Sequence, residues 1–236
     1  MVRVMPAGAP APVKFDLSKQ SVRELNQFLH GDLKDVARVR VENPDGAHSI
    51  AVAVDAPVRI EIAGHAGYYA AGMNQQGTVV IEGNAGPGVA ENMMSGRVEV
   101  AGFASGGAGA SAHGGLLVIR GDAGLRCGIS LKGGDIVVGG GVGSFSAFMA
   151  QAGRIVICGD AAEGLGDSIY EAVLYVRGEI RSLGADAVVQ PMTADDIAAV
   201  TSLLAAADID ASAREFKRVG SARKLYHWNA DANQEY

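Results

Sequence analysis

The sequence has 236 residues, of which 48% are hydrophobic, 19% charged and 6% aromatic, and its net charge is −6. A chain of this length can bury a sizeable core, and its hydrophobic fraction is too high for a disordered protein. The 33 glycines follow no Gly-X-Y triplet, which excludes collagen, and the negative charge gives no indication of a nucleic-acid partner.

Three features predict a soluble, cytoplasmic protein. Residues 1–14 are expected to form a flexible tail, rich in Ala and Pro and without the apolar core of a signal peptide. No apolar stretch reaches the roughly 18 residues that cross a bilayer. Cys127 and Cys158 form no CxxC pair, which favours a reducing compartment.

Residues 15–57 are predicted to form an N-terminal cap. Residues 18–30 have helical spacing of apolar residues. The runs Val36–Val41 and Ser49–Val54 flank Asn43-Pro44-Asp45-Gly46, which predicts a β-hairpin. The helix has four apolar residues on one face: Val22, Leu25, Phe28 and Leu29.

Residues 58–190 contain a repeat with a period of 19 residues. Aliphatic residues stand two and four positions before a repeated glycine, so each unit predicts a short strand with one face inward. The glycine is expected to bend the chain through positive φ. The repeated glycines are Gly64, Gly83, Gly102, Gly121, Gly140, Gly159 and Gly178.

Two further columns repeat with the same period. Five units open with glycine, at positions 77, 96, 115, 134 and 153. Each unit also has a small residue seven positions after the repeated glycine: Ala71, Ala90, Gly109, Gly128, Ala147, Gly166 and Ala185.

Strands of this kind bury their apolar faces only by stacking in register. The spacing of two excludes helices, in which each glycine would also cost about 1 kcal/mol. Pro57 lies just before the repeat and Pro191 lies just after it. Proline has no N–H to donate to the hydrogen-bonded ladder between strands, so its position at the two ends agrees with a stack of paired strands. The sequence therefore predicts an all-β, single-stranded parallel β-helix of seven 19-residue coils, with flanking helices at both termini.

Residues 191–236 are predicted to form a helical cap and a tail that docks onto a partner. Thr193 is the expected N-cap of a helix over residues 193–206. Five basic residues lie within positions 214–224, and the aromatic run Leu225-Tyr-His-Trp follows. A solvated tail is the alternative, but arginine and aromatic side chains are common interface anchors. The predicted anchors are Arg218, Tyr226 and Trp228.

The residue between the two aliphatic columns should point out of the coil. It is Glu61, Val80, Glu99, Val118, Val137, Val156 and Tyr175 in successive units. An apolar stripe on an outward face usually marks an interface, so a partner subunit is one explanation. A terminal helix of the same chain is the other, and the sequence leaves both open. The candidate interface residues are Val118, Val137, Val156 and Tyr175.

The sequence provides no catalytic, cofactor-binding or metal-ligating constellation. Its five histidines share no column and no metal-ligand spacing. The segment Gly139–Gly143 is similar to a phosphate-binding loop, but the repeat accounts for its glycines and no helix follows. No base is recognisable beside either cysteine. We therefore expect no catalytic, cofactor-binding or metal residue in this chain.

The units Gly115-Leu-Leu-Val-Ile-Arg-Gly-Asp-Ala-Gly and Gly134-Asp-Ile-Val-Val-Gly-Gly resemble the GXGXG β-helix domain. That domain forms the C-terminus of the glutamate synthase large subunit. It is also a separate chain in glutamate synthase-like enzymes, including N-methylglutamate synthase, and the β-helical subunit of formylmethanofuran dehydrogenase. The tail Phe216-Lys-Arg-Val-Gly-Ser-Ala-Arg-Lys-Leu-Tyr-His-Trp-Asn-Ala-Asp is similar to the free-standing glutamate synthase-type subunit.

The resemblance implies a right-handed coil and a scaffold role in a heteromeric complex. Its partners would be a class II glutamine-amidotransferase-like subunit and an FMN-binding glutamate synthase-like subunit, which also carries the iron–sulfur cluster. The implied reaction of methylamine metabolism converts glutamate and methylamine to N-methylglutamate and ammonia. The alternative is the β-helical subunit of a formylmethanofuran dehydrogenase or formyltransferase/hydrolase complex in one-carbon metabolism. A stand-alone enzyme is disfavoured because the sequence lacks the hexapeptide repeats of β-helical acyltransferases. A carbohydrate binder is disfavoured because the sequence lacks the acidic or aromatic residues that line the grooves of such proteins.

Overall fold

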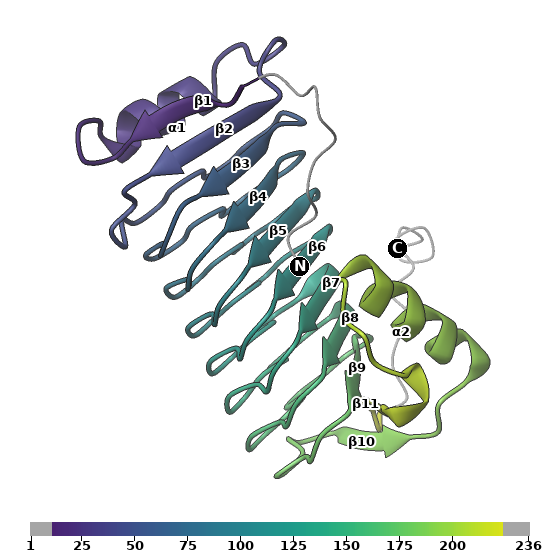
Figure 1. The fold of residues 1–236 in the computed structure, drawn as a ribbon. Coiled ribbons are helices and arrows are strands. Elements are labelled where there is room, and N and C mark those ends of the chain that lie inside the picture. Colours follow the sequence, from purple (N-terminus) through teal and green to yellow (C-terminus); the bar gives the residue numbers. More distant parts are fainter. Residues whose placement is uncertain (1–10, 224–236) are drawn as a thin grey trace, which may run out of the picture.

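The computed structural model describes residues 11–223, which form a parallel β-solenoid (Figure 1). Its sheet has the order β1-β2-β3-β4-β5-β6-β7-β8-β9-β11-β10. The stacked strands are β1 (Val13–Asp16), β2 (Arg38–Glu42), β3 (Arg59–Ile62), β4 (Thr78–Ile81), β5 (Arg97–Val100), β6 (Leu116–Ile119), β7 (Lys132–Val138), β8 (Ala152–Ile157) and β9 (Val173–Val176). The remaining elements are α1 (Val22–Leu29), β10 (Ala187–Gln190), α2 (Ala194–Ala206), the 3-10 turn Ala213–Glu215 and β11 (Lys217–Ser221).

The register of the strands confirms the predicted fold class. Arg59 pairs with Thr78, Thr78 with Arg97, and the pairing continues in parallel to β9 at the interval of 19 residues. A second parallel ladder of isolated bridges joins equivalent residues after each repeated glycine, from Ala66 to Ile180. Only β11 runs antiparallel, between β9 and β10, within the described chain.

The predicted hairpin between residues 36 and 54 is wrong. Strand β2 pairs in parallel with both β1 and β3, so it adds a strand to the stack. Ser49, Ala51 and Ala53 have φ angles of 55°, 55° and 52°, which an extended strand does not allow. The Asn43–Gly46 turn therefore ends a strand of the solenoid, and the residues after it form the turn segment of an additional coil.

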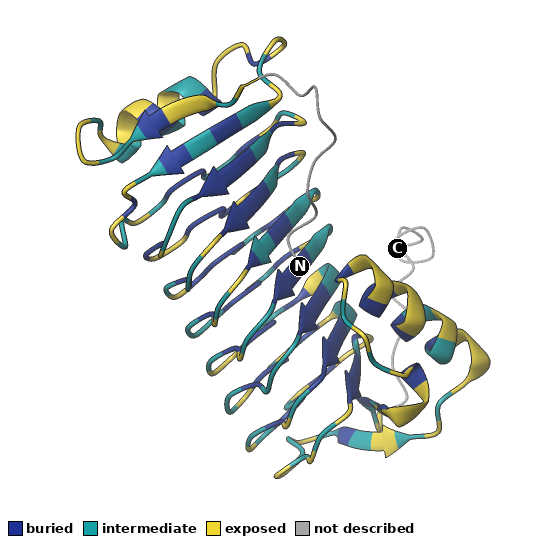
Figure 2. Cartoon of the chain, viewed as in Figure 1, coloured by how far each residue is buried: buried dark blue, intermediate teal, exposed yellow. Residues whose placement is uncertain are grey.

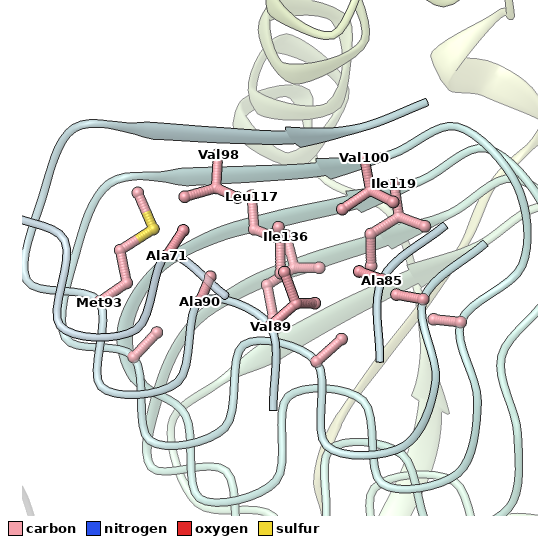
Figure 3. Packing of buried hydrophobic residues seen from close by; sticks show 14 of the residues in the cluster. Ala71, Ala85, Val89, Ala90, Met93, Val98, Val100, Leu117, Ile119 and Ile136 are labelled. Carbon is pink, nitrogen blue, oxygen red and sulfur yellow. The ribbon is translucent and has the colours of Figure 1, made fainter. Parts of the chain in front are cut away.

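The core lies inside the stack, between the strands and the turn segments that connect them. Figure 3 shows Val98, Leu117 and Ile136 of the strands pointing toward Val89 and Ala90 of the turn segments. All five of these residues are buried, and Figure 2 shows that the stacked strands are largely buried. Because equivalent residues repeat every 19 positions, each aliphatic column continues through the stack as one cluster.

The small-residue column is explained by backbone shape and by space. Ala90 and Gly109 have φ angles of 56° and 65°, in the left-handed region. A Cβ atom at Gly109 would stand 2.6 Å from Cδ1 of Ile136. The column therefore accepts only residues that tolerate positive φ and that leave the aliphatic ladder in place.

Glycine is required at the repeated position for a reason other than the one that the sequence suggested. Within that column only Gly64 has positive φ, at 146°. A Cβ atom at Gly159 would lie 2.6 Å from the carbonyl carbon of Gly140 in the preceding coil, so close backbone stacking excludes larger residues. Positive φ occurs instead in the opening column, for example 81° at Gly115 and 74° at Gly134.

Helix α1 packs at the N-terminal end of the solenoid. It begins after Ser21, which forms a reciprocal capping box with Glu24. Leu25 and Leu29 are buried in the core, and the ring centroid of Phe28 lies 5.0 Å from that of Phe15. In residues 11–223, neither this helix nor α2 has the length and apolarity to span a membrane.

Candidate interaction surface

The apolar stripe on the outward face of the sheet is covered by the chain itself. Its four side chains form a buried cluster with Val200, Leu203 and Leu204 of α2 and with Phe216. The partner-interface prediction for these four residues is therefore wrong, and the terminal-helix alternative is confirmed. A tethered helix has a high effective concentration at the stripe, which favours it over a separate chain. The exposed fractions are 0% for Val118, Val137 and Val156 and 2% for Tyr175.

Polar contacts fix the first turn of α2 against β9 and β11. Tyr175 Oη donates to Asp196 Oδ1 at 2.7 Å, and Arg218 Nε donates to the same oxygen at 3.2 Å. Burial opposes ionisation of Asp196, but its hydrogen bonds with Thr193 and Tyr175 and the charge of Arg218 lower its pKa to about 2. Arg218, which the sequence placed in a partner interface, thus binds the helix of its own chain.

Two arginines of the sheet bind the carboxyl end of α2. Arg97 Nη2 donates to the carbonyl of Ala206 at 2.9 Å. Arg120 Nη1 donates to the carbonyls of Ala207 and Asp208. These cations satisfy terminal carbonyl groups and complement the negative end of the helix dipole. The helix is therefore anchored at both ends.

The outward face of β2 to β5 lies beyond α2 and carries paired charges (Figure 1). Glu61 accepts from Arg38 at 2.9 Å and from Arg59 at 2.8 Å, and Arg40 binds Glu82 in a bidentate arrangement. Burial opposes ionisation of Glu61, but these two arginines lower its pKa. Because these charges pair both within a strand and between strands, this half of the sheet is already neutralised by its own side chains.

Large apolar side chains are exposed on the segments that connect the strands, which together form the turn surface. Leu125, Phe145 and Met149 have exposed fractions of 57%, 46% and 49%. The ring of Phe148 meets that of Phe145 edge-on, with centroids 6.5 Å apart. A second group on the turn surface, nearer the N-terminus, comprises Tyr68, Tyr69, Met73 and Met94.

The sequence reasoning missed the turn surface because it followed the strand columns. A signal was present: Tyr69 and Phe145 occupy the same position of coils that begin four periods apart, and so do Met73 and Met149. The two rings lie over glycines of the next coil. A Cβ atom at Gly164 would stand 3.0 Å from the Phe145 ring. Because glycine has no side chain, each aromatic ring packs against the backbone of the next coil.

The thiols and the described histidines do not form a reactive group. Burial raises the pKa of Cys127 to about 12 and also raises the pKa of Cys158. His65 Nδ1 accepts a hydrogen bond from the backbone N–H of Asn84 at 2.9 Å, so it joins neighbouring coils. Among residues 11–223, no cluster of His, Cys, Asp or Glu could hold a metal ion. Tyr226 and Trp228, the other predicted anchors, lie outside the described residues.

No family model matches the chain. Over 225 residues the chain is 57% identical to Protein GlxC of Rhizobium meliloti (strain 1021), which covers 94% of this chain and 98% of that protein. The fold is similar to a chain in the crystal structure of the formyltransferase/hydrolase complex FhcABCD from Methylorubrum extorquens with methylofuran. The TM-score is 0.59 at 23% identity, over 92% of this chain and 94% of that chain, and this similarity supports the solenoid fold alone.

Proposed function

This chain belongs to the family of Protein GlxC, and we propose that it is a non-catalytic scaffold subunit of a glutamate synthase-type complex. The partners are a class II glutamine-amidotransferase-like chain and an FMN-binding glutamate synthase-like chain, which carries the iron–sulfur cluster. The reaction that the assembly performs is that of N-methylglutamate synthase. Glutamate and methylamine give N-methylglutamate and ammonia, and the chemistry takes place on the partner chains.

The turn surface is the observation that carries this proposal. A monomeric solenoid gains nothing from exposing large apolar side chains such as Leu125, Phe145 and Met149, because each remains hydrated. Aromatic and methionine side chains are enriched in protein interfaces, where their burial stabilises association. The backbone beneath them is held by hydrogen bonds to the coils on both sides, for example from Phe145 N to Glu163 O at 2.8 Å. A rigid surface with exposed apolar side chains suits a scaffold.

Purification of the tagged chain from its own cells tests the proposal. Native mass spectrometry and an absorption spectrum are recorded on the same sample. We expect larger chains in fixed stoichiometry and the absorption of a flavin and an iron–sulfur cluster. A colourless, solitary chain would contradict both the scaffold role and the proposed partners.

A formyltransferase/hydrolase-type complex is the second candidate. A chain of the FhcABCD complex has a similar fold over 92% of this chain, so the fold is compatible with this second role. The same purification separates the two candidates. A colourless assembly with a zinc-containing amidohydrolase-like chain would support one-carbon metabolism and overturn the glutamate synthase-type assignment.

A further inference from the structure

The turn surface carries the same pair of large apolar residues twice. Tyr69 and Phe145 occupy one position of their coils, and Met73 and Met149 occupy another, four periods of 19 residues apart in both cases. Coils stack about 4.8 Å apart, so the two pairs lie roughly 19 Å from each other along the solenoid. Other coils hold polar residues there, for example Asn92, so the fold does not require apolar ones. The two pairs are therefore a property of the surface and not of the core.

The coil midway between the two pairs has small residues at these positions, Gly107 and Ser111. A Cβ atom at Gly107 would have its nearest neighbour 4.0 Å away, so packing within the chain leaves room for a larger residue. Arg126 occupies the same position one coil later, at a φ angle of 57°, so a long side chain is compatible with this backbone. The small residues of the middle coil allow a second molecule to approach the backbone closely.

The coils on the two sides of the middle coil carry opposite charges. The Glu91 carboxylate lies beside Tyr69, since a Cβ atom at Gly88 would stand 2.9 Å from Glu91 Oε2 and 2.6 Å from Cδ1 of the Tyr69 ring. On the other side Arg126 is exposed and precedes Phe145 by one period. In the described part of the chain, neither Glu91 nor Arg126 takes part in an ion pair. Each apolar pair thus has one uncompensated charge next to it.

A twofold axis perpendicular to the turn surface at the middle coil makes the two apolar pairs complementary to each other. Such an axis reverses the order of the coils, so the coil of Tyr69 and Met73 faces the coil of Phe145 and Met149 in the second copy. It also reverses the direction within each coil, so Tyr69 faces Met149 and Met73 faces Phe145. Contacts between a methionine sulfur and an aromatic ring are favourable.

The coils next to the axis match under the same operation. The coil of Glu91 faces the coil of Arg126 in the second copy, so opposite charges meet on both sides of the axis. Met94 and Leu125, which are both exposed, come to lie next to each other in the same way. Apolar and charged groups are therefore both arranged for contact between identical surfaces.

We propose that the turn surface binds a second copy of this chain about a twofold axis at Gly107 and Ser111. The inference goes beyond the proposed function, because a contact between identical chains does not depend on which enzyme chains accompany them. Within a complex the contact joins two identical halves. Each copy contributes only a few large side chains, so the contact is weak. The isolated chain is monomeric when dilute and pairs at high concentration.

Sedimentation velocity of the isolated full chain over a wide range of concentration tests the proposal. The mass should rise from that of a monomer to that of a dimer and no further. Phe145→Ser should weaken association about tenfold, since aromatic side chains carry much of the binding energy of an interface. Phe103→Ser is the matched control, because Phe103 has an exposed fraction of 51%, compared with 46% for Phe145, but lies outside the paired positions. Circular dichroism verifies that both variants are folded.

Charge reversal tests the two ionic contacts. Arg126→Glu should weaken association several-fold, because it places an acidic residue opposite Glu91 of the second copy. The double variant Glu91→Arg with Arg126→Glu should restore association, because it exchanges the two charges and keeps them opposite. Both effects should diminish at high salt, which screens exposed charges.

Cysteine cross-linking tests the antiparallel arrangement. A chain with Met73→Cys is mixed with a differently tagged chain with Phe145→Cys and then oxidised. The mixture should give a disulfide-linked dimer of the two chains. Either variant alone should not, because copies of the same residue are separated by roughly 19 Å along the solenoid, beyond the reach of a disulfide. The native Cys127 and Cys158 are buried and do not compete.

Three results would overturn the proposal. The chain could remain monomeric at the highest concentration. Phe145→Ser could associate as strongly as Phe103→Ser, or each cysteine variant could cross-link with itself as readily as the mixture does. None of these measurements uses the flavin and iron–sulfur absorption that tests the proposed function, so either proposal can fail without the other.

Discussion

Positive φ angles recur at alternate positions of the turn segments, and hydrogen bonding explains them. Tyr69, Ala71 and Met73 have φ angles of 58°, 54° and 55°. The N–H of Ala71 donates to the preceding coil, whereas those of Tyr69 and Met73 donate to the next coil. Each such residue other than glycine costs about 1–2 kcal/mol of backbone strain, and the hydrogen bonds between coils offset this cost.

Gly128→Ala tests whether space adds to this strain. Its φ angle is 66°, and a new Cβ atom would collide with Cδ1 of Ile155. The strain of about 1–2 kcal/mol and the overpacking of about 1–3 kcal/mol should add. Gly107→Ala is the control, since its φ angle is 70° but the nearest atom lies 4.0 Å away. Equal shifts of the urea unfolding midpoint in the two variants would refute the packing argument.

Helix α2 shows why the sequence left open two explanations for the apolar stripe on the sheet. The outward valines indicated that something covers the sheet, and Thr193 correctly marked the start of the helix. The Ala/Leu-rich run, however, has apolar residues on several faces, so its packing face was not readable. The contacts that place it, from Arg97 and Arg120 to its carboxyl end, are long-range and follow no sequence spacing.

Val137→Asp should destabilise the solenoid by several kcal/mol. Val137 is fully buried beneath α2, and a charge there has no partner. The control is Val189→Asp on β10, where the side chain is 55% exposed and the change should stay within about 0.5 kcal/mol. Urea unfolding measures both values. A variant at position 137 as stable as the control would mean that α2 does not cover the stripe.

The Asp196 carboxylate should make the anchoring of α2 sensitive to acid. Its pKa is lowered to about 2 in the folded chain, compared with about 3.9 in an unfolded one. Its contribution, about 2 kcal/mol, is therefore complete above pH 4 and is lost as the pH falls through 4 toward 2. Asp196→Asn should remove this part of the acid dependence, whereas Asp195→Asn, at an exposed neighbouring position, should preserve it. Thermal unfolding between about pH 2 and pH 6 measures the difference between the variants.

At the scale of the whole molecule, the two kinds of surface have different roles. The sheet face is occupied by α2 over its C-terminal half and by ion pairs such as Arg59–Glu61 over the other half. The turn surface carries exposed aromatic and methionine side chains. Partner contacts are therefore expected on the turn surface.

The solenoid could be predicted from the sequence because its core residues recur at the same positions of every coil. Each coil therefore repeats the same pattern, and the repeated columns of residues agree with one another. It did not predict the first coil, since the run from Arg38 to Arg59 spans 21 residues and breaks the period. It also did not predict the exposed surface, where Phe145 and Met149 stand among turn residues with no required pattern. Periodicity in the sequence reveals the residues that the fold requires in every coil. A contact with a partner involves only some of the coils, so it leaves no periodic pattern.

Hydrogen exchange of the full chain, alone and within its purified complex, tests the scaffold account most directly. The account predicts slower amide exchange in the complex at residues 124–130 and 143–149, which carry the exposed side chains of the turn surface. Strands β3 to β5, whose outward charges are already paired, should exchange equally in both samples. Protection confined to those strands, or no protection anywhere, would contradict the account.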